Sequence, residues 1–411
     1  DSTDLIYLRL INLIGIIPIF LSYNILKKSD IEINLHLTFL ILISSYFFFY
    51  FFLDLRMYFL LLCFSFLLHS LNLTNSVEKN YKILFISSAI ISSLLHIFGL
   101  TISMSILFYR LIINLYNKNY RYFKIDLIFE ILIFIVFFIF YLPIILNDAN
   151  IREFGWVKNQ LWIYRVFIEW SSNSLIFIFL SIFLLLFQLR LKIFNLNNYN
   201  YFFQSSFYRI SLHLISPAVI LMIVTLVVSF LVVPIISYRN LIVIYPNLVL
   251  FAGALSYLIL QNKKFKKIFI IFLIVLTFIN INFYFKNMIK SAENIEWVIR
   301  KTFNKNCNNS LVYFNDGGNK DYLARTLSKI TNIYAEFNRP IKSLVDFKKD
   351  ELNKYLEQNK SCKTYFFSFH TKNFEDYINQ LKLKGLNFSI QYAPNVRYKN
   401  SSKSGAIAII N

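Results

Sequence analysis

Three short clusters of charged and aromatic residues stand at the ends of long apolar runs. The first is the run 54–58, Asp-Leu-Arg-Met-Tyr, the second is the run 96–99, His-Ile-Phe-Gly, and the third contains Arg239. A guanidinium group holds a phosphate through two parallel hydrogen bonds, and a neighbouring carboxylate can fix its orientation. If Arg56 and Arg239 converge, they would form a site for a phosphate or pyrophosphate group.

Each cluster also has a purely structural explanation. Asp54 and Arg56 could form an ion pair at the edge of a membrane, with the arginine side chain reaching toward water. A lone histidine such as His96 usually forms a hydrogen bond between packed helices. Arg56 and Arg239 could also be two independent interfacial arginines. Charged groups at membrane depth are costly, however, so their presence is the starting point for a functional hypothesis.

The composition indicates which elements must position these residues. The chain has 411 residues, of which 57% are hydrophobic and only 16% are charged. A soluble domain has about 45–50% apolar and about 25% charged residues. A water-soluble core cannot bury so much apolar surface, whereas a bilayer can. The sequence therefore predicts an α-helical polytopic membrane protein with about ten transmembrane helices. The expected spans are 9–26, 34–53, 57–72, 83–99, 101–116, 127–146, 174–192, 210–233, 241–260 and 267–285.

The distribution of Lys and Arg among the loops predicts the orientation of these helices. Most of them fall in alternate loops, among them Lys27, Lys28 and the lysine-rich run 263–267. Loops rich in Lys and Arg stay in the cytoplasm, so Asp1, Arg56 and Arg239 are expected outside. An even number of spans would place the C-terminal tail outside as well. The expected location is the cytoplasmic (inner) membrane of a bacterium.

Two acidic residues stand near the cytoplasmic start of one expected span. Asp126 and Glu130 are four residues apart on one helical face, close in sequence to Arg121 and Lys124. Side chains at this spacing interact on a helix surface. The pattern favours a paired charged edge over a proton relay.

The composition changes near residue 286, which predicts two domains, 1–285 in the membrane and 286–411 in solution. Short runs typical of strands alternate in the tail with runs typical of helices, which predicts a small α/β domain. The tail also contains Cys307 and Cys362, which could form a disulfide outside the cytoplasm or remain free thiols. The expected strands are 310–314, 364–369, 388–392 and 406–410, and the expected helices are 293–303, 321–330, 347–358 and 373–384.

The order of the three clusters resembles that in GT-C type membrane glycosyltransferases, in particular the bacterial relatives of protein O-mannosyltransferases and the lipid A aminoarabinose transferase. In that family an exterior turn often reads acid-x-Arg-x-Tyr, like the run 54–58. A later span often contains His-aromatic-Gly, of which the run 96–99 is a looser version with one extra residue. Another exterior turn has Arg followed by Pro at a helix start, like Arg239 and Pro246. Leu8-Arg9-Leu10 resembles the lead into the family's second span.

The resemblance implies transfer of a sugar, with inversion, from a polyprenyl-phosphate carrier to a lipid, glycan or protein acceptor outside the cytoplasm. It implies that the substrate-binding residues are Asp54, Arg56, Tyr58, His96 and Arg239. The two arginines would stabilise the departing lipid phosphate. The partners would be the lipid-linked donor, the acceptor and the bilayer, with no cofactor, metal or nucleic acid.

The residue that acts as general base is not identified in this sequence. In the family an Asp on the first exterior loop removes the proton of the acceptor hydroxyl. That loop and the helix before it would precede Asp1, so the resemblance implies a chain truncated at its N-terminus, with its base upstream of Asp1.

Two other classes of membrane protein remain as alternatives. A transporter or flippase for lipid-linked sugars would often show internal repeats and helices broken near the membrane midplane. No convincing repeat is present, and the strongest charges lie at the expected outer surface. A polymerase or ligase of lipid-linked saccharides would be expected to carry paired arginines in a large exterior loop, and it needs no α/β tail.

Overall fold

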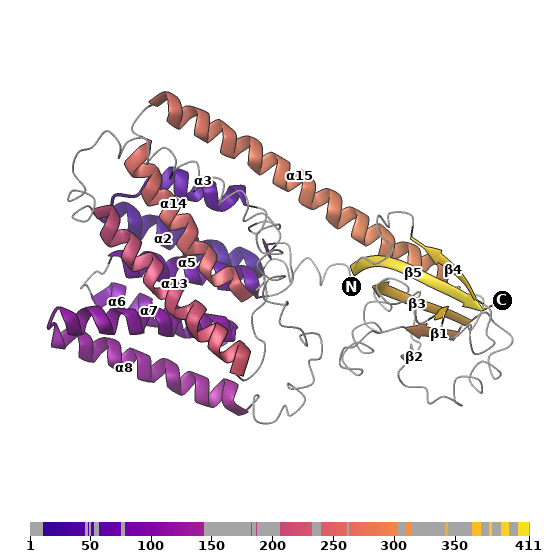
Figure 1. The fold of residues 1–411 in the computed structure, drawn as a ribbon, viewed down its shortest axis with the longest axis horizontal. Coiled ribbons are helices and arrows are strands. Elements are labelled where there is room, and N and C mark those ends of the chain that lie inside the picture. The colour runs from indigo at the N-terminus through magenta and orange to yellow at the C-terminus, as the bar shows by residue number, and fades with distance from the viewer. Residues whose placement is uncertain are drawn as a thin grey trace. The chain divides into compact units, whose positions relative to one another are not determined.

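The computed structural model divides into two compact units, residues 3–282 and residues 283–411 (Figure 1). The structure describes residues 11–45, 48, 51–52, 57–74, 79–143, 182, 186, 206–231, 240–260, 263–302, 310–313, 342–343, 364–370, 378–379, 388–393 and 402–410.

The first unit is a bundle of helices. Its described elements are the 3₁₀ turn η1 (Ile11–Gly15), α2 (Ile16–Lys28), α3 (Leu35–Ser44), α5 (Tyr58–Thr74), α6 (Lys79–Leu95), α7 (Ile97–Tyr116), α8 (Tyr120–Val136), the π-helical turn η2 (Phe137–Tyr141), α13 (Ser206–Leu231), the 3₁₀ turn η6 (Asn240–Ile244), α14 (Tyr245–Ile259) and α15 (Lys263–Thr302). Helix α15 continues past the unit boundary at residue 283.

Helices lie within each expected span that the described residues reach, but several ends differ. Helix α3 stops at Ser44, within the expected span 34–53, and Ser45 caps it in an extended conformation. Helix α8 begins at Tyr120, seven residues before the expected start at 127. Of the expected span 174–192, the structure describes Ile182 and Leu186, both helical. The helices are therefore where hydropathy places them, while tertiary contacts decide where they end.

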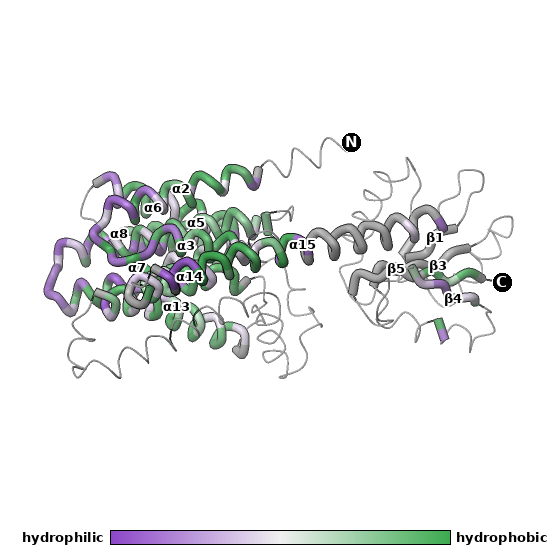
Figure 2. Tube along the Cα trace, turned by 90° about the horizontal axis from the view of Figure 1, so that it is seen from above, coloured by the Kyte–Doolittle hydropathy of each residue, from purple (hydrophilic) through white to green (hydrophobic). Residues whose placement is uncertain are grey.

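Two described helices, Ile97–Tyr116 and Phe207–Ser229, are long and apolar enough to cross a membrane by length and composition. Large apolar side chains also face outward on α8, α13 and α15, for example Ile128 at 55%, Ile223 at 57% and Phe278 at 69% exposure. Soluble monomers rarely expose contiguous apolar areas of this extent. Figure 2 shows these green surfaces along the helices, with hydrophilic residues gathered at one end of the bundle.

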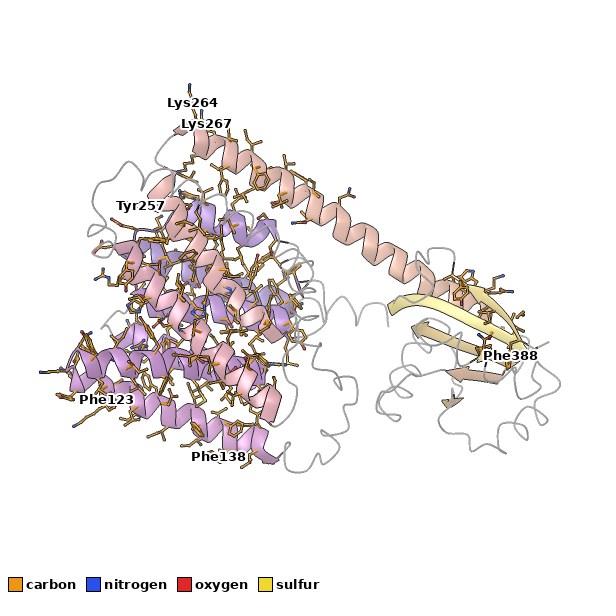
Figure 3. The ribbon with its side chains drawn as sticks, viewed as in Figure 1. Phe123, Phe138, Tyr257, Lys264, Lys267 and Phe388 are labelled. Atoms are coloured by element: carbon orange, nitrogen blue, oxygen red, sulfur yellow. The ribbon has the colours of Figure 1, made fainter. Side chains whose placement is uncertain are left out.

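The hydrophilic end of the bundle carries exposed lysines. Lys27 and Lys28 are the last residues of α2 and are exposed. Lys264 and Lys267 project from the first turns of α15 (Figure 3) and are exposed as well. The turn from α7 to α8 is also at this end, and it contains Lys118 with a positive φ of 55°.

Helix α5 is the most buried helix of the bundle, with almost its whole length covered. It packs against α2, α6, α14 and η6. Helices α3 and α14 approach each other closely because residue 253 is a glycine. A Cβ at Gly253 of α14 would collide with the Thr38 hydroxyl of α3. Asn280 joins α15 to the end of α3, because its Nδ2 donates to the Ser44 carbonyl over 2.6 Å.

The expected pairing of Asp126 with the nearby cations of its own segment is wrong. Asp126 instead faces α7, where Arg110 contacts both carboxylate oxygens over 3.1 and 3.3 Å. Asn114 donates to the same carboxylate over 2.7 Å. The guanidinium carbon of Arg110 also lies 4.9 Å from the centre of the Phe85 ring. The acid thus joins α8 to α7 inside the bundle, because it is on the buried side of α8.

Helix α13 contains a proline in its interior, and its lost hydrogen bond is replaced. Pro217 has no N–H for the carbonyl of residue 213, four positions earlier. Asn72 of α5 donates from Nδ2 to that His213 carbonyl over 3.0 Å. Asn247 of α14 donates to the next carbonyl, that of Leu214, over 3.2 Å. Helix α13 is continuous across Pro217, so the proline break is a break in its hydrogen bonding alone, and the two asparagines bond to the carbonyls there.

Helix α14 begins inside the bundle. Residues 241–245 are almost wholly buried, between 0 and 7% exposed, and Val243 lies beside His69. At a rise of 1.5 Å per residue, His69 is about 16 Å along α5 from Tyr58. The residues around this helix start contact three other helices: Val243 lies beside His69 of α5, Tyr245 lies beside Ser45 at the end of α3, and Asn247 bonds to Leu214 of α13.

The second unit contains a five-stranded sheet. The strands are β1 (Ser310–Tyr313), β2 (Lys342–Ser343), β3 (Thr364–His370), β4 (Phe388–Tyr392) and β5 (Ser402–Ile410), in the order β2-β1-β3-β5-β4. Strand β1 pairs in parallel with β2 and β3, and β5 pairs antiparallel with β3 and β4. The four expected strands coincide with β1, β3, β4 and β5 to within a few residues. The expected helix 293–303 is the end of α15, and Cys307 and Cys362 lie outside the described residues.

Candidate functional site

Two of the five expected substrate-binding residues are described, and they lie together. Tyr58 is the first residue of α5, and His96 stands alone between α6 and α7. Their ring centres are 5.5 Å apart with an interplanar angle of 49°. Asp54, Arg56 and Arg239 lie outside the described residues. The structure therefore brings two of the sequence clusters to one place through Tyr58 and His96.

His96 caps the helix that follows it. Its backbone is extended, with φ −164° and ψ 149°, and its Nδ1 accepts a hydrogen bond from the Phe98 N–H over 3.1 Å. Asn and Asp cap helices with a side-chain oxygen in the same way, so His96 supplies a nitrogen in place of that oxygen. The break between α6 and α7 falls at His96, four residues before the expected one at 100.

The cap fixes the proton of the neutral imidazole. Because Nδ1 accepts a hydrogen bond, the single ring proton must be on Nε2. The free face of His96 therefore offers an N–H donor. While it caps α7, the imidazole can donate to an oxygen of a ligand, but it cannot remove a proton through Nδ1.

The turn from α6 to α7 also requires Gly99. A Cβ at this position would collide with the carbonyl group of Ser92 in α6, so only glycine allows the two helices to approach. The next residues are held by backbone bonds, since the His96 carbonyl accepts from the N–H groups of Gly99 and Leu100 over 2.8 and 3.2 Å. The His-Ile-Phe-Gly run thus has a clear structural role.

Aromatic rings surround the imidazole. The Phe51 ring centre is 5.5 Å from that of Tyr58, and the Phe98 ring centre is 5.8 Å from that of His96. Phe51 and Phe98 are fully buried, whereas Tyr58 and His96 are half-buried. We therefore find a half-buried N–H donor in an aromatic environment, suited to bind an oxygen of a sugar or a phosphate. The described residues around it include no carboxylate that could act as a base.

An apolar cavity of about 360 Å³ lies between α13 and the η6–α14 segment. Its walls include Leu214, Ala218 and Met222 on one side and Ile244, Leu248 and Phe251 on the other. Asn247 is the one polar residue among its described lining residues. The cavity can hold an apolar chain, and the proline break of α13 forms part of its wall.

Several buried polar residues were missed at the level of sequence. Arg110 is inside an expected span, and Ser65, His69 and Asn72 are inside another. The latter three have a spacing of four and three residues, which places them on one helical face. That spacing within an apolar run was the available signal.

No protein-family model matches the chain, and no curated protein matches it. Among solved structures, ArnT from Cupriavidus metallidurans bound to undecaprenyl phosphate is similar over 98% of this chain and 83% of that chain, with 11% identical residues and a TM-score of 0.36. A likeness of this degree carries no argument about the site, so the chemistry rests on the residues of this chain.

Proposed function

We propose that this chain is a membrane glycosyltransferase that moves a sugar from a polyprenyl-phosphate carrier to an acceptor outside the cytoplasm. The observation that carries the proposal is the contact between Tyr58 and His96, which belong to separate sequence clusters. Their order along the chain suggested one site, and their rings do lie 5.5 Å apart. The half-buried Nε2–H of His96 is a suitable donor for an oxygen of the carrier phosphate.

The surface of the helical unit supports a location in the bilayer. Exposed apolar side chains on α8, α13 and α15 would face lipid, which removes the cost of exposing them to water. The exposed lysines at the end of α2 and the start of α15 would face the cytoplasm. The proposed topology therefore has about ten spans, with residues 286–411 outside.

The proposed reaction is a substitution at the anomeric carbon. The acceptor hydroxyl oxygen attacks this carbon, the bond from carbon to phosphate oxygen breaks, and the polyprenyl phosphate leaves with the electron pair. The hydroxyl proton passes to a base that the described residues near His96 do not include. Arg56, oriented by Asp54, and Arg239 are proposed to stabilise the charge that develops on the leaving phosphate.

The apolar cavity supports a lipid-linked donor. An isoprenoid chain needs an apolar surface and no hydrogen-bond partners, and the walls of the cavity supply such a surface. We propose that part of the carrier chain lies between α13 and α14. The acceptor would approach from the outer side, where Tyr58 begins α5.

The proposal is tested by separating the two roles of His96, which caps α7 through Nδ1 and is proposed to donate to the carrier phosphate through Nε2–H. His96→Asn retains a side-chain acceptor for the Phe98 N–H but lacks Nε2–H. Binding of a synthetic polyprenyl phosphate to the purified full chain should weaken about tenfold, as expected for loss of one hydrogen bond to a charged group worth about 1.5 kcal/mol. Binding of the matching polyprenol, which has no phosphate, should not change.

The control is Leu94→Asn, at an exposed position of α6 two residues before His96. It introduces the same side chain away from the imidazole and should leave the preference for phosphate over alcohol intact. If His96→Asn also leaves that preference intact, His96 is only a helix cap and the proposed phosphate contact is wrong.

One observation favours a second function, a transporter or flippase for lipid-linked sugars. Helix α14 starts inside the bundle beside the proline break of α13, and broken helices at depth are common in transporters. Liposomes that contain the purified chain and a fluorescent polyprenyl phosphate distinguish the two. Rapid appearance of the outer-leaflet probe in the inner leaflet, without sugar transfer by the same preparation, would support the transporter.

A further inference from the structure

The buried face of α5 carries three polar residues in a row. Ser65, His69 and Asn72 are at most 1% exposed and follow one another at spacings of four and three residues. They therefore lie along one face of the helix. This face contacts η6, where α14 begins, and Asn72 contacts α13 at its proline break. Two helix breaks and three polar side chains thus meet inside the bundle.

Most of the hydrogen-bonding capacity of these side chains is unused. The Ser65 hydroxyl, both ring nitrogens of His69 and Oδ1 of Asn72 are buried and have no hydrogen-bond partner in the part of the chain that the structure describes. The imidazole faces the backbone of Val243, but not within hydrogen-bond geometry. Each serine hydroxyl, imidazole or amide in this state has lost its bonds to water without replacement, which is unfavourable.

Unused polar atoms continue onto the facing helices. Oδ1 of Asn247 and Nδ1 of His213 are also buried without a partner among the described residues. Asn247 is at the proline break, since it donates to the Leu214 carbonyl, whereas the His213 imidazole packs against Tyr109 of α7 with ring centres 5.4 Å apart. Asn247 also lines the apolar cavity between α13 and α14, to which no polar atom contributes surface.

The hydrogen-bonding groups of these side chains indicate which ligand they can bind. It offers hydroxyl, imidazole and amide groups, which both donate and accept hydrogen bonds, and it contains no carboxylate or thiol to hold a metal. Side chains four residues apart on a helix have Cβ atoms about 5–6 Å apart, a gap that one small molecule can bridge. Water both donates and accepts, and a buried water typically makes about three hydrogen bonds to polar groups of this kind.

We propose that Ser65, His69 and Asn72, together with Asn247, form a binding site for internal water between α5, α13 and the start of α14. Ordered water re-satisfies backbone and side-chain groups at helix breaks inside membrane proteins. The site is separated from Tyr58 by the buried residues Leu61 and Leu62 on the same helix. It is therefore distinct from the proposed phosphate contact at His96, although Asn247 also lines the cavity proposed for the carrier chain.

Hydroxyl-radical footprinting of the full chain in lipid nanodiscs tests the proposal directly. X-rays generate radicals from water, including trapped water, and these oxidise the side chains beside it. His69 and Phe66 are both 0% exposed aromatic rings on α5, and Phe66 packs against Phe39. We expect His69 to gain oxygen several-fold faster than Phe66. Equal and slow oxidation of the two rings would overturn the proposal.

A double-mutant cycle gives an independent readout. Ser65 and His69 are not hydrogen-bonded to each other, so a shared water would add coupling beyond that of two neighbouring side chains on one helix face. The decreases in Tm for Ser65→Ala and His69→Leu should therefore sum to more than the decrease for the double variant, because the bridging water is lost once. Ser65→Ala with Ser70→Ala is the control pair, since Ser70 donates to the Phe66 carbonyl and should be additive. Additivity in both pairs would contradict the inference.

Discussion

The partners of His96 and Asp126 explain why single residues were harder to place than helices. His96 is held by the N–H of Phe98, two residues later, and Asp126 by Arg110 and Asn114 of the preceding helix. Sequence spacing correctly grouped Tyr58 with His96, because both stand where apolar runs end. It gave Asp126 the wrong partners, because nearby cations in sequence are on the exposed side of α8.

Removing one charge of the Arg110–Asp126 ion pair should lower the free energy of unfolding more than removing both charges. Asp126→Asn leaves the Arg110 guanidinium, whose side chain is 14% exposed, without its counter-charge. The free energy of unfolding should fall by about 3–5 kcal/mol, the range for breaking a buried ion pair by removing one partner. Denaturation of the purified chain in mixed micelles measures this loss.

Two matched variants separate charge from packing. Arg110→Met combined with Asp126→Leu removes both charges and should be more stable than Asp126→Asn alone. Arg121→Gln, at an exposed position on α8, should change stability by less than about 0.5 kcal/mol. A double variant as unstable as Asp126→Asn would show that the pair contributes through shape and not through charge.

At the scale of elements, the helices were predictable and their breaks were not. Length and hydropathy identify apolar helices such as α5, α7 and α13 to within a few residues of the expected spans. The start of α14 at a buried Tyr245 could not be predicted, because hydropathy is the same for a helix that begins at the membrane surface and one that begins inside a bundle. Its depth is decided by contacts with His69 and Leu214, both remote in sequence.

Pro217 and Asn72 should depend on each other. In the native chain, Asn72→Leu removes the donor for the His213 carbonyl and should cost about 1–3 kcal/mol. In a Pro217→Ala background, the new N–H of residue 217 can bond that carbonyl, so the same Asn72→Leu change should cost much less. Thermal or denaturant unfolding of the four chains measures the difference. An equal cost in both backgrounds would mean that the asparagine acts through its own packing alone.

At the scale of the whole molecule, charge and apolar surface together suggest an orientation in a bilayer. Exposed lysines gather at the end of the bundle where α2 stops and α15 starts. Met57 precedes α5 and is 44% exposed. The expected orientation puts Lys264 in the cytoplasm and Met57 outside.

Cysteine accessibility tests this orientation. Met57→Cys and Lys264→Cys are introduced into a chain whose native cysteines are replaced by Ser. A membrane-impermeant maleimide added to intact cells should label the cysteine at 57, and should label the one at 264 only after the membrane is made permeable. The reverse pattern would place the Tyr58–His96 end in the cytoplasm and exclude an acceptor outside it.

The internal start of α14 has a consequence for how the protein is made. Its first turn is buried beside α5, and Asn247 bonds to α13. A membrane protein is inserted from its N-terminus onward, so α5 and α13 are already synthesised when this segment emerges. The η6–α14 segment can take its place only once those two helices have come together, because its polar groups have no partners in lipid. For a chain inserted into a bilayer as proposed, this predicts a late assembly step, in which a short segment enters a bundle that has already formed.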